Sequence, residues 1–112
     1  MVRMRKVGIV LGEILWYLGR DTKGAHVFEI NVYGKLNAEH SDTLREILGY
    51  AMSEIQVIYN EWGNYLRIRL LVPEENLGGF IERFVSDGEP IQTVMAGAKA
   101  SPLPPLQNPG RH

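Results

Sequence analysis

The feature that most constrains the fold is a strict alternation of apolar and polar side chains over residues 25–36. Successive side chains of a β-strand point to opposite faces of a sheet, so a period of two indicates a strand with one buried face. The buried positions would be His26, Phe28, Ile30 and Val32. Residues 65–72 repeat the pattern with Leu66, Ile68, Leu70 and Val72. The sequence therefore predicts two half-buried strands whose apolar sides need a covering layer.

Two stretches with the helical repeat of three or four residues are predicted to form that layer. Residues 37–55 carry the stripe Leu44, Ile47, Leu48, Ala51, Met52 and Ile55, and Asn37 or Ser41 can cap the first turn. Residues 74–87 carry the stripe Leu77, Phe80, Ile81, Phe84 and Val85, and Gly88 and Pro90 follow. Because each helix has a single apolar stripe, we expect both on one face of an antiparallel sheet.

Residues 7–18 are the most apolar run and are predicted as one strand with two apolar faces. Such a strand would lie at the centre of the sheet or against another subunit. A helix is the alternative because Gly8 and Gly12 are four residues apart, but each glycine would cost a helix about 1 kcal/mol. Glu13 interrupts the run, so we expect a bulge that reaches solvent there, with a functional acid as the alternative.

These elements are predicted to form one α+β domain of order ββαββαβ, a two-layer sandwich of the ferredoxin-like or a related kind. A hairpin spans residues 56–73 with its turn at 61–64, and a last strand is predicted at 90–99. The domain covers residues 6–100, between a flexible start at 1–5 and a proline-rich, disordered tail at 101–112. The element order resembles that of small translation initiation factors related to eukaryotic initiation factor one, and no motif accompanies the resemblance.

Charge and cysteine content narrow the classes of function. With 12 basic and 13 acidic residues, the 112-residue chain lacks the strongly basic field of a typical nucleic-acid-binding protein. It has no cysteine, which suits the cytoplasm and excludes disulfides and thiolate sites. The apolar run at 7–18 is shorter than the roughly 20 residues that span a bilayer, so no membrane association is expected. Basic residues precede it as in a signal peptide, but no small-residue cleavage site follows, and a buried strand is favoured.

No catalytic or ligand-binding motif is present: the sequence has no phosphate-binding loop, dinucleotide fingerprint, nucleophile elbow or zinc-protease motif. His40 lies beside Glu39 and Ser41, where a solvated helix start is favoured over a general base. His26 is expected in the core or an interface rather than on a metal. We therefore predict no catalytic residue, metal or cofactor. A small enzyme whose site forms between subunits, with Glu13, His26 or His40, is kept as an alternative.

The polar side of the two alternating strands is the most informative candidate site, and it displays Glu29, Asn31, Tyr33, Tyr65, Arg67 and Arg69. Glu29 is expected to pair with an arginine across the strands. The leading hypothesis is a non-enzymatic binding or adaptor protein that associates with itself, first as a dimer, or with another protein. The second hypothesis is a single-stranded RNA- or DNA-binding module that uses Tyr33, Tyr65, Arg67 and Arg69. Trp62, at the predicted hairpin tip, is a further candidate anchor for a partner.

Overall fold

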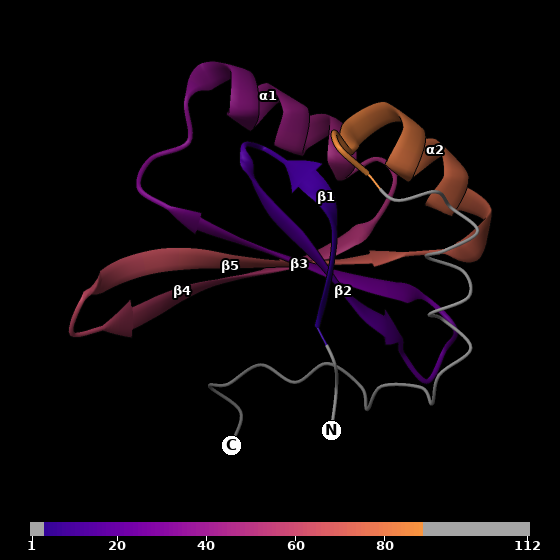
Figure 1. The fold of residues 1–112 in the computed structure, drawn as a ribbon, viewed down its shortest axis with the longest axis horizontal. Coiled ribbons are helices and arrows are strands. Elements are labelled where there is room, and N and C mark those ends of the chain that lie inside the picture. The colour runs from indigo at the N-terminus through magenta and orange to yellow at the C-terminus, as the bar shows by residue number, and fades with distance from the viewer. Residues whose placement is uncertain (1–3, 89–112) are drawn as a thin grey trace.

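The computed structural model describes residues 4–88, which form one antiparallel sheet and two helices (Figure 1). The strands are β1 (Arg5–Val10), β2 (Glu13–Arg20), β3 (His26–Tyr33), β4 (Met52–Asn60) and β5 (Gly63–Val72). The helices are α1 (Ala38–Ile47), between β3 and β4, and α2 (Glu74–Phe84), after β5. The strands lie side by side in the order β1-β2-β3-β5-β4, so β1 and β4 are the two edges.

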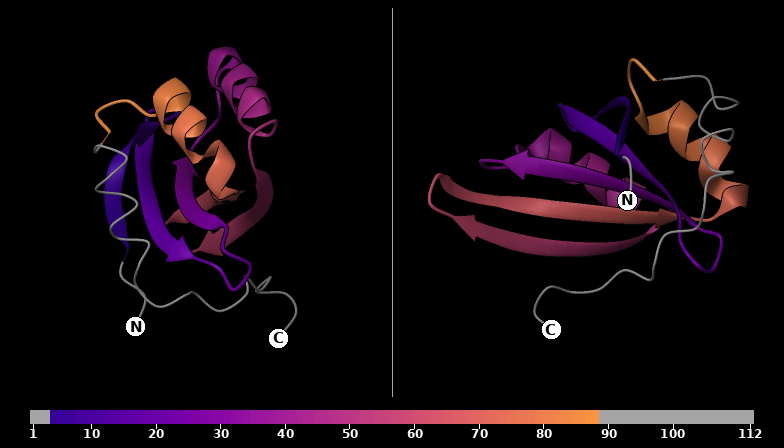
Figure 2. Two further views of the ribbon diagram at one scale, coloured as in Figure 1. Left: turned by 90° about the vertical axis from the view of Figure 1, so that its right-hand side faces the viewer. Right: turned by 60° about the horizontal axis from the view of Figure 1, so that its bottom comes forward.

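Both helices pack on the same face of the sheet, as the single stripes predict (Figures 1 and 2). The apolar positions of β3 lie opposite those of β5, with Phe28 paired to Leu70 and Ile30 to Ile68. These side chains are fully buried together with Ile47 of α1 and with Leu77 and Phe80 of α2. The prediction of an α+β fold with an antiparallel sheet is therefore confirmed.

The predicted single strand at residues 7–18 is wrong, and so is its helical alternative. The chain reverses at Leu11 and Gly12, which join β1 to β2 in a tight hairpin. Both turn residues have positive φ, 57° at Leu11 and 74° at Gly12. A two-residue turn needs this conformation at both positions to match the twist of the strands that it joins. Gly12 is thus a turn residue rather than a bulge. Glu13 starts β2 beside this turn and is half-buried.

The outer edge of β1 is paired with the residues that follow α2. Ile9 and Ser86 exchange two backbone hydrogen bonds, of 2.8 and 2.9 Å, in an antiparallel bridge. Val85 is already extended there, so α2 ends at Phe84, three residues before its predicted end. Gly8 permits this close approach, because a Cβ on Gly8 would lie 2.9 Å from the carbonyl oxygen of Ser86 and would overlap Val85.

The first helix is much shorter than its stripe predicts. It begins as expected, with the side chain of Asn37 accepting a 2.7 Å hydrogen bond from the His40 amide. It ends at Ile47, however, and β4 begins at Met52. The prediction that residues 51–55 continue the helix is therefore wrong, because Met52 and Ile55 belong to an edge strand, where both are exposed.

The hairpin of β4 and β5 confirms the second predicted strand pair. Its turn lies at Glu61 and Trp62, within the predicted segment, and Pro73 directly follows β5. The described order is βββαββα, so the N-terminal half has one strand more than predicted, and a ferredoxin-like arrangement is not confirmed. The predicted strand at 90–99 and the tail at 101–112 lie outside the described residues, as do residues 1–3. Neither helix in residues 4–88 is long and apolar enough to cross a membrane.

Candidate interaction surface

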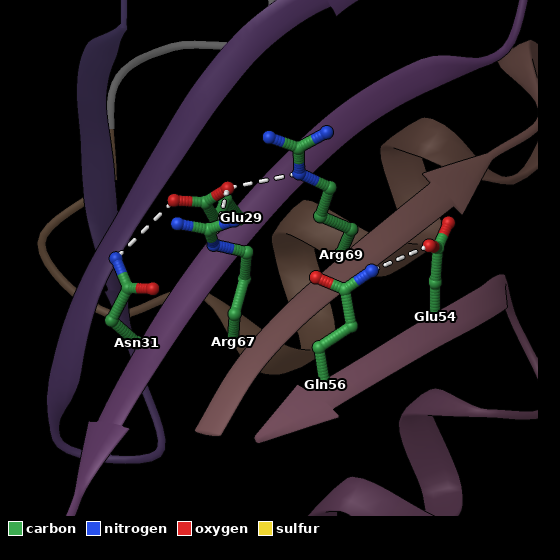
Figure 3. Close-up of polar contacts among 6 residues, drawn as sticks. All are labelled: Glu29, Asn31, Glu54, Gln56, Arg67 and Arg69. Atoms are coloured by element: carbon green, nitrogen blue, oxygen red, sulfur yellow. Dashed lines mark hydrogen bonds and ion pairs between the residues drawn. The ribbon is translucent and has the colours of Figure 1, made fainter. Parts of the chain in front are cut away.

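The face of the sheet turned away from the helices, called here the reverse face, carries a cluster of ionic side chains around Glu29. Glu29 is 5% exposed, and its Oε1 accepts a 2.9 Å hydrogen bond from Nε of Arg69. The same oxygen lies 3.7 Å from Nε of Arg67, and its Oε2 accepts a 3.3 Å bond from Asn31. Figure 3 shows these side chains rising from β3 and β5. The predicted pairing of Glu29 with an arginine across the strands is confirmed.

Charge on this cluster is balanced. Arg67 and Arg69 carry two positive charges, and Glu29 with Glu54 of β4 carries two negative ones, with Glu54 directly opposite Arg69 in the register. Beyond its Nε, the guanidinium of Arg69 points away from Glu29 (Figure 3). The reverse face therefore offers guanidinium groups to a partner but no net positive field.

A pair of tyrosines continues the reverse face at one end of β3 and β5. Tyr33 lies opposite Tyr65 in the register, with ring centroids 4.9 Å apart and planes at 34°. The Tyr33 ring is 64% exposed, so one face of the pair is open to solvent. The next pair on this face is Asn31 with Arg67. The fold thus brings together the four residues predicted to form one surface: Tyr33, Tyr65, Arg67 and Arg69.

Toward β2 the reverse face becomes apolar. Trp16 lies opposite Glu29 in the register of β2 and β3, and it packs against Leu18 and Val27, which are both buried. The surface therefore runs from an apolar cluster through an ionic centre to aromatic rings. Such a mixture is typical of protein–protein interfaces.

The two other candidate residues lie elsewhere. Trp62 is 86% exposed at the turn between β4 and β5, so its ring does not fold back onto the domain. Glu13 is at the β1–β2 turn, with β3 and β5 between its strand and β4. Within residues 4–88 its side chain makes no hydrogen bond or ion pair. His26 pairs with Arg20 at the far end of β2, roughly 20 Å along the strand from Glu13, so the fold does not join Glu13 and His26 within one chain. The His40 ring lies beside Gly12 at the β1–β2 turn, where a Cβ on Gly12 would be 3.4 Å from its Cε1.

Edge strand β4 presents a surface that the sequence analysis missed. Met52 and Tyr59 are 76% and 75% exposed, and Ile55 and Val57 are each 49% exposed. Ile55 and Val57 lie opposite Ile68 and Leu66, on the face that the helices cover elsewhere. The signal was the alternation of residues 55, 57 and 59, which the longer helical stripe concealed.

A buried polar pair lies at the other end of the domain. The Tyr17 hydroxyl and Nδ1 of His26 are 2.9 Å apart, and Nε2 of His26 is buried without a hydrogen bond. Burial raises the pKa of Tyr17 to about 12 and lowers the pKa of His26, and the charge of Arg20 adds to the second shift. Arg20 forms a 2.6 Å ion pair with Glu74. Both shifts favour the neutral forms, so the pair serves the core rather than proton transfer with solvent.

Within residues 4–88, no three histidine or acidic side chains gather where they could hold a metal ion. No protein-family model, curated protein or solved structure matches the chain. The surfaces of residues 4–88 are therefore the features of this chain that bear on its function.

Proposed function

We propose that this chain is a small non-enzymatic binding protein that assembles with copies of itself, first as a dimer. The observation that carries the proposal is the row of exposed apolar side chains on the helix side of β4, formed by Ile55, Val57 and Tyr59, which leads to the exposed Trp62 at the hairpin turn. A contiguous apolar surface of this kind is typical of interaction sites rather than of the surface of a monomer. The lack of cysteine supports a cytoplasmic location.

The shape of the molecule supports the same proposal. The end of the β4–β5 hairpin extends beyond both helices in Figure 1 and in the right panel of Figure 2. Ile55 and Val57 face the helix layer, yet half of each side chain remains exposed. Covering these residues with a second copy would remove apolar surface from water at about 25 cal/mol per Å².

Light scattering over a range of concentrations tests the proposal. We expect the wild-type protein to show the mass of a dimer at high micromolar concentration. Val57→Lys should shift the mass toward the monomer, because a charge would be buried at the contact. Asn64→Lys is the matched control: it adds the same charge on β5, directly opposite Tyr59 but away from the sheet edge. A monomeric wild-type protein at these concentrations would contradict the proposal.

The second candidate function is single-stranded nucleic-acid binding on the reverse face. It is favoured by one observation, the solvent-open tyrosine pair next to two arginines. Stacked aromatic rings and guanidinium groups can hold bases and phosphates. The balanced charge of the cluster weighs against it, because phosphate contacts supply much of the affinity of such proteins.

Fluorescence anisotropy with mixed-sequence oligonucleotides tests this second function. Binding would weaken steeply with salt, and Arg67→Ala would reduce it at least about tenfold. Arg45→Ala removes the same charge from the exposed surface of α1 and should leave it unchanged. Binding that is absent, or that both variants weaken equally, excludes a nucleic-acid site on the reverse face.

A further inference from the structure

We propose that strand β4 of one copy pairs antiparallel with β4 of a second copy, so that the two sheets join into one across a two-fold axis. This inference rests on the proposed self-association and specifies its geometry. It places the contact at the edge of the sheet, whereas the sequence analysis placed it on the Tyr and Arg face.

The two edges of the described sheet differ in how much of their backbone is already paired. At the β1 edge, Ile9 is already bonded to Ser86 through both of its backbone polar groups. At the other edge, β4 has β5 as its only neighbour in residues 4–88, and it runs for nine residues from Met52 to Asn60. The longer unpaired edge is therefore β4, and a contact of β4 with β4 about a two-fold axis uses the same surface on both copies, so it closes after one pairing and forms a dimer.

Strand β4 lacks the devices that normally prevent edge pairing. Exposed edges are usually protected by lysine, proline, a bulge or short length. Strand β4 has no lysine or proline, pairs with β5 without a register shift, and carries Glu54 as its one charged side chain. Its backbone is therefore available to another strand, and its exposed side chains do not repel a second copy.

The sequence of β4 is complementary to itself about Gln56, the middle residue of the strand. An antiparallel pairing centred there uses the whole strand and places Ile55 opposite Val57 of the partner subunit. Because the axis relates the two copies, this apolar pair occurs twice, and both pairs lie on the helix side of the joined sheet. Glu54 lies opposite Ile58 of the partner subunit, so no two like charges meet.

Moving the centre by two residues in either direction makes the pairing worse, because only five of the nine residues of β4 would then face the partner strand. A centre at Glu54 would place two carboxylates directly opposite each other, which destabilises a strand pair. It would also leave the end of β4, with the exposed Tyr59, outside the contact. The register centred on Gln56 is therefore the one that the side chains favour.

The absence of cysteine from the chain makes disulfide trapping a direct test, because one substitution introduces the only thiol. In the proposed register, Gln56→Cys places two thiols on the axis, with Cα atoms roughly 4.5 to 5.5 Å apart, within the range of a disulfide. Ser53→Cys is the matched control on the same strand. Its two copies would lie six residues apart along the joined strands, or roughly 20 Å, too far to bond.

Mild oxidation of each single-cysteine protein, followed by non-reducing electrophoresis, gives the readout. We expect Gln56→Cys to form linked dimer at least about ten times faster than Ser53→Cys. Tyr33→Cys reports on the alternative contact through the reverse face. Faster trapping through Tyr33→Cys than through Gln56→Cys, in a protein that scatters light as a dimer, would overturn the edge pairing and leave self-association standing. A wild-type monomer would overturn both.

Discussion

Glu29 is the acidic side chain that compensates the two arginines of the reverse face. It is almost fully buried, and one of its oxygens faces Nε of both Arg67 and Arg69. Glu29→Gln would remove the charge while keeping the size of the side chain. We expect it to lower the free energy of unfolding by about 1–3 kcal/mol, because the half-buried guanidinium groups lose their charged acceptor. Urea denaturation of both proteins measures the difference.

Glu54→Gln is the control for this change. Glu54 is on the neighbouring strand, is more exposed, and bonds only to Gln56 within the described residues, at 2.9 Å. Its substitution should change stability by no more than about 0.5 kcal/mol. Equal losses for the two variants would show that Glu29 has no special part in compensating the arginines.

The buried Tyr17–His26 pair predicts that stability falls at both ends of the pH range. Below about pH 6.5, unfolded His26 takes up a proton that the native state resists, because its pKa is lowered in the fold. Above about pH 10, unfolded Tyr17 loses a proton that the native state keeps until its pKa of about 12. In both pH ranges the unfolded state is stabilised by the change in protonation and the native state is not, so the free energy of unfolding falls.

Urea midpoints measured at pH 5, 8 and 11 test this pair. We expect the alkaline loss attributable to Tyr17 to be on the order of 1 kcal/mol. Tyr17→Phe removes the titrating hydroxyl, so it should flatten the alkaline limb while lowering stability at pH 8 by about 1 kcal/mol through the lost hydrogen bond. An alkaline limb as steep in Tyr17→Phe as in the wild type would contradict the assignment.

Side-chain chemistry made some of these features predictable. Alternation placed Glu29, Arg67 and Arg69 on one face, and a lone acid among arginines indicated the ion pair. The turn at Leu11 was not predictable by the same rules, because the first position of such a turn usually holds asparagine, aspartate or glycine. Leu11 adopts φ of 57° and is 8% exposed, so its burial in the core offsets an unfavourable backbone conformation.

At the scale of elements, Gly8 leaves the room that the segment after α2 needs to pair with β1 at Ile9. Gly8→Ala would place a methyl group against the Ser86 carbonyl and the Val85 side chain. We expect a loss of about 1–3 kcal/mol in the free energy of unfolding, because a backbone carbonyl as well as the branched Val85 side chain is in the way. Chemical denaturation measures it.

A double-mutant cycle with Val85→Ala distinguishes this contact from a general effect of substituting glycine. Removing the Val85 methyl groups relieves part of the overlap, so Gly8→Ala should cost at least about 0.5 kcal/mol less in that background. Costs that simply add would show that Val85 is not in contact with position 8.

The boundary between α1 and β4 shows where sequence patterns become ambiguous. Residues 51, 52 and 55 extend a helical stripe, and residues 55, 57 and 59 begin a strand alternation, so Ile55 fits both periods. Local pattern alone does not choose between them. In the fold, β4 bonds along its whole length to β5, and those backbone bonds outweigh one further turn of helix.

For the whole molecule, the early end of α1 means that β4 forms an edge of the sheet with exposed apolar side chains. A longer α1 would have buried Met52 and Ile55, and the exposed surface would then have been only the polar face that the sequence predicts. With β4 at the edge, one edge of the described sheet is bridged at Ile9 and the other, β4, is paired only with β5. Self-association is therefore proposed at the edge, while the reverse face keeps its tyrosines and arginines for a further partner.

The most direct test of this account is amide hydrogen exchange across residues 52–60, measured at low and at high micromolar concentration. Edge pairing predicts that about half of the β4 amides, those turned away from β5, gain protection as concentration rises, while the amides of α1 stay unchanged. Exchange of β4 that stays unchanged over a concentration range in which light scattering shows the monomer converting to a dimer would contradict pairing at this edge.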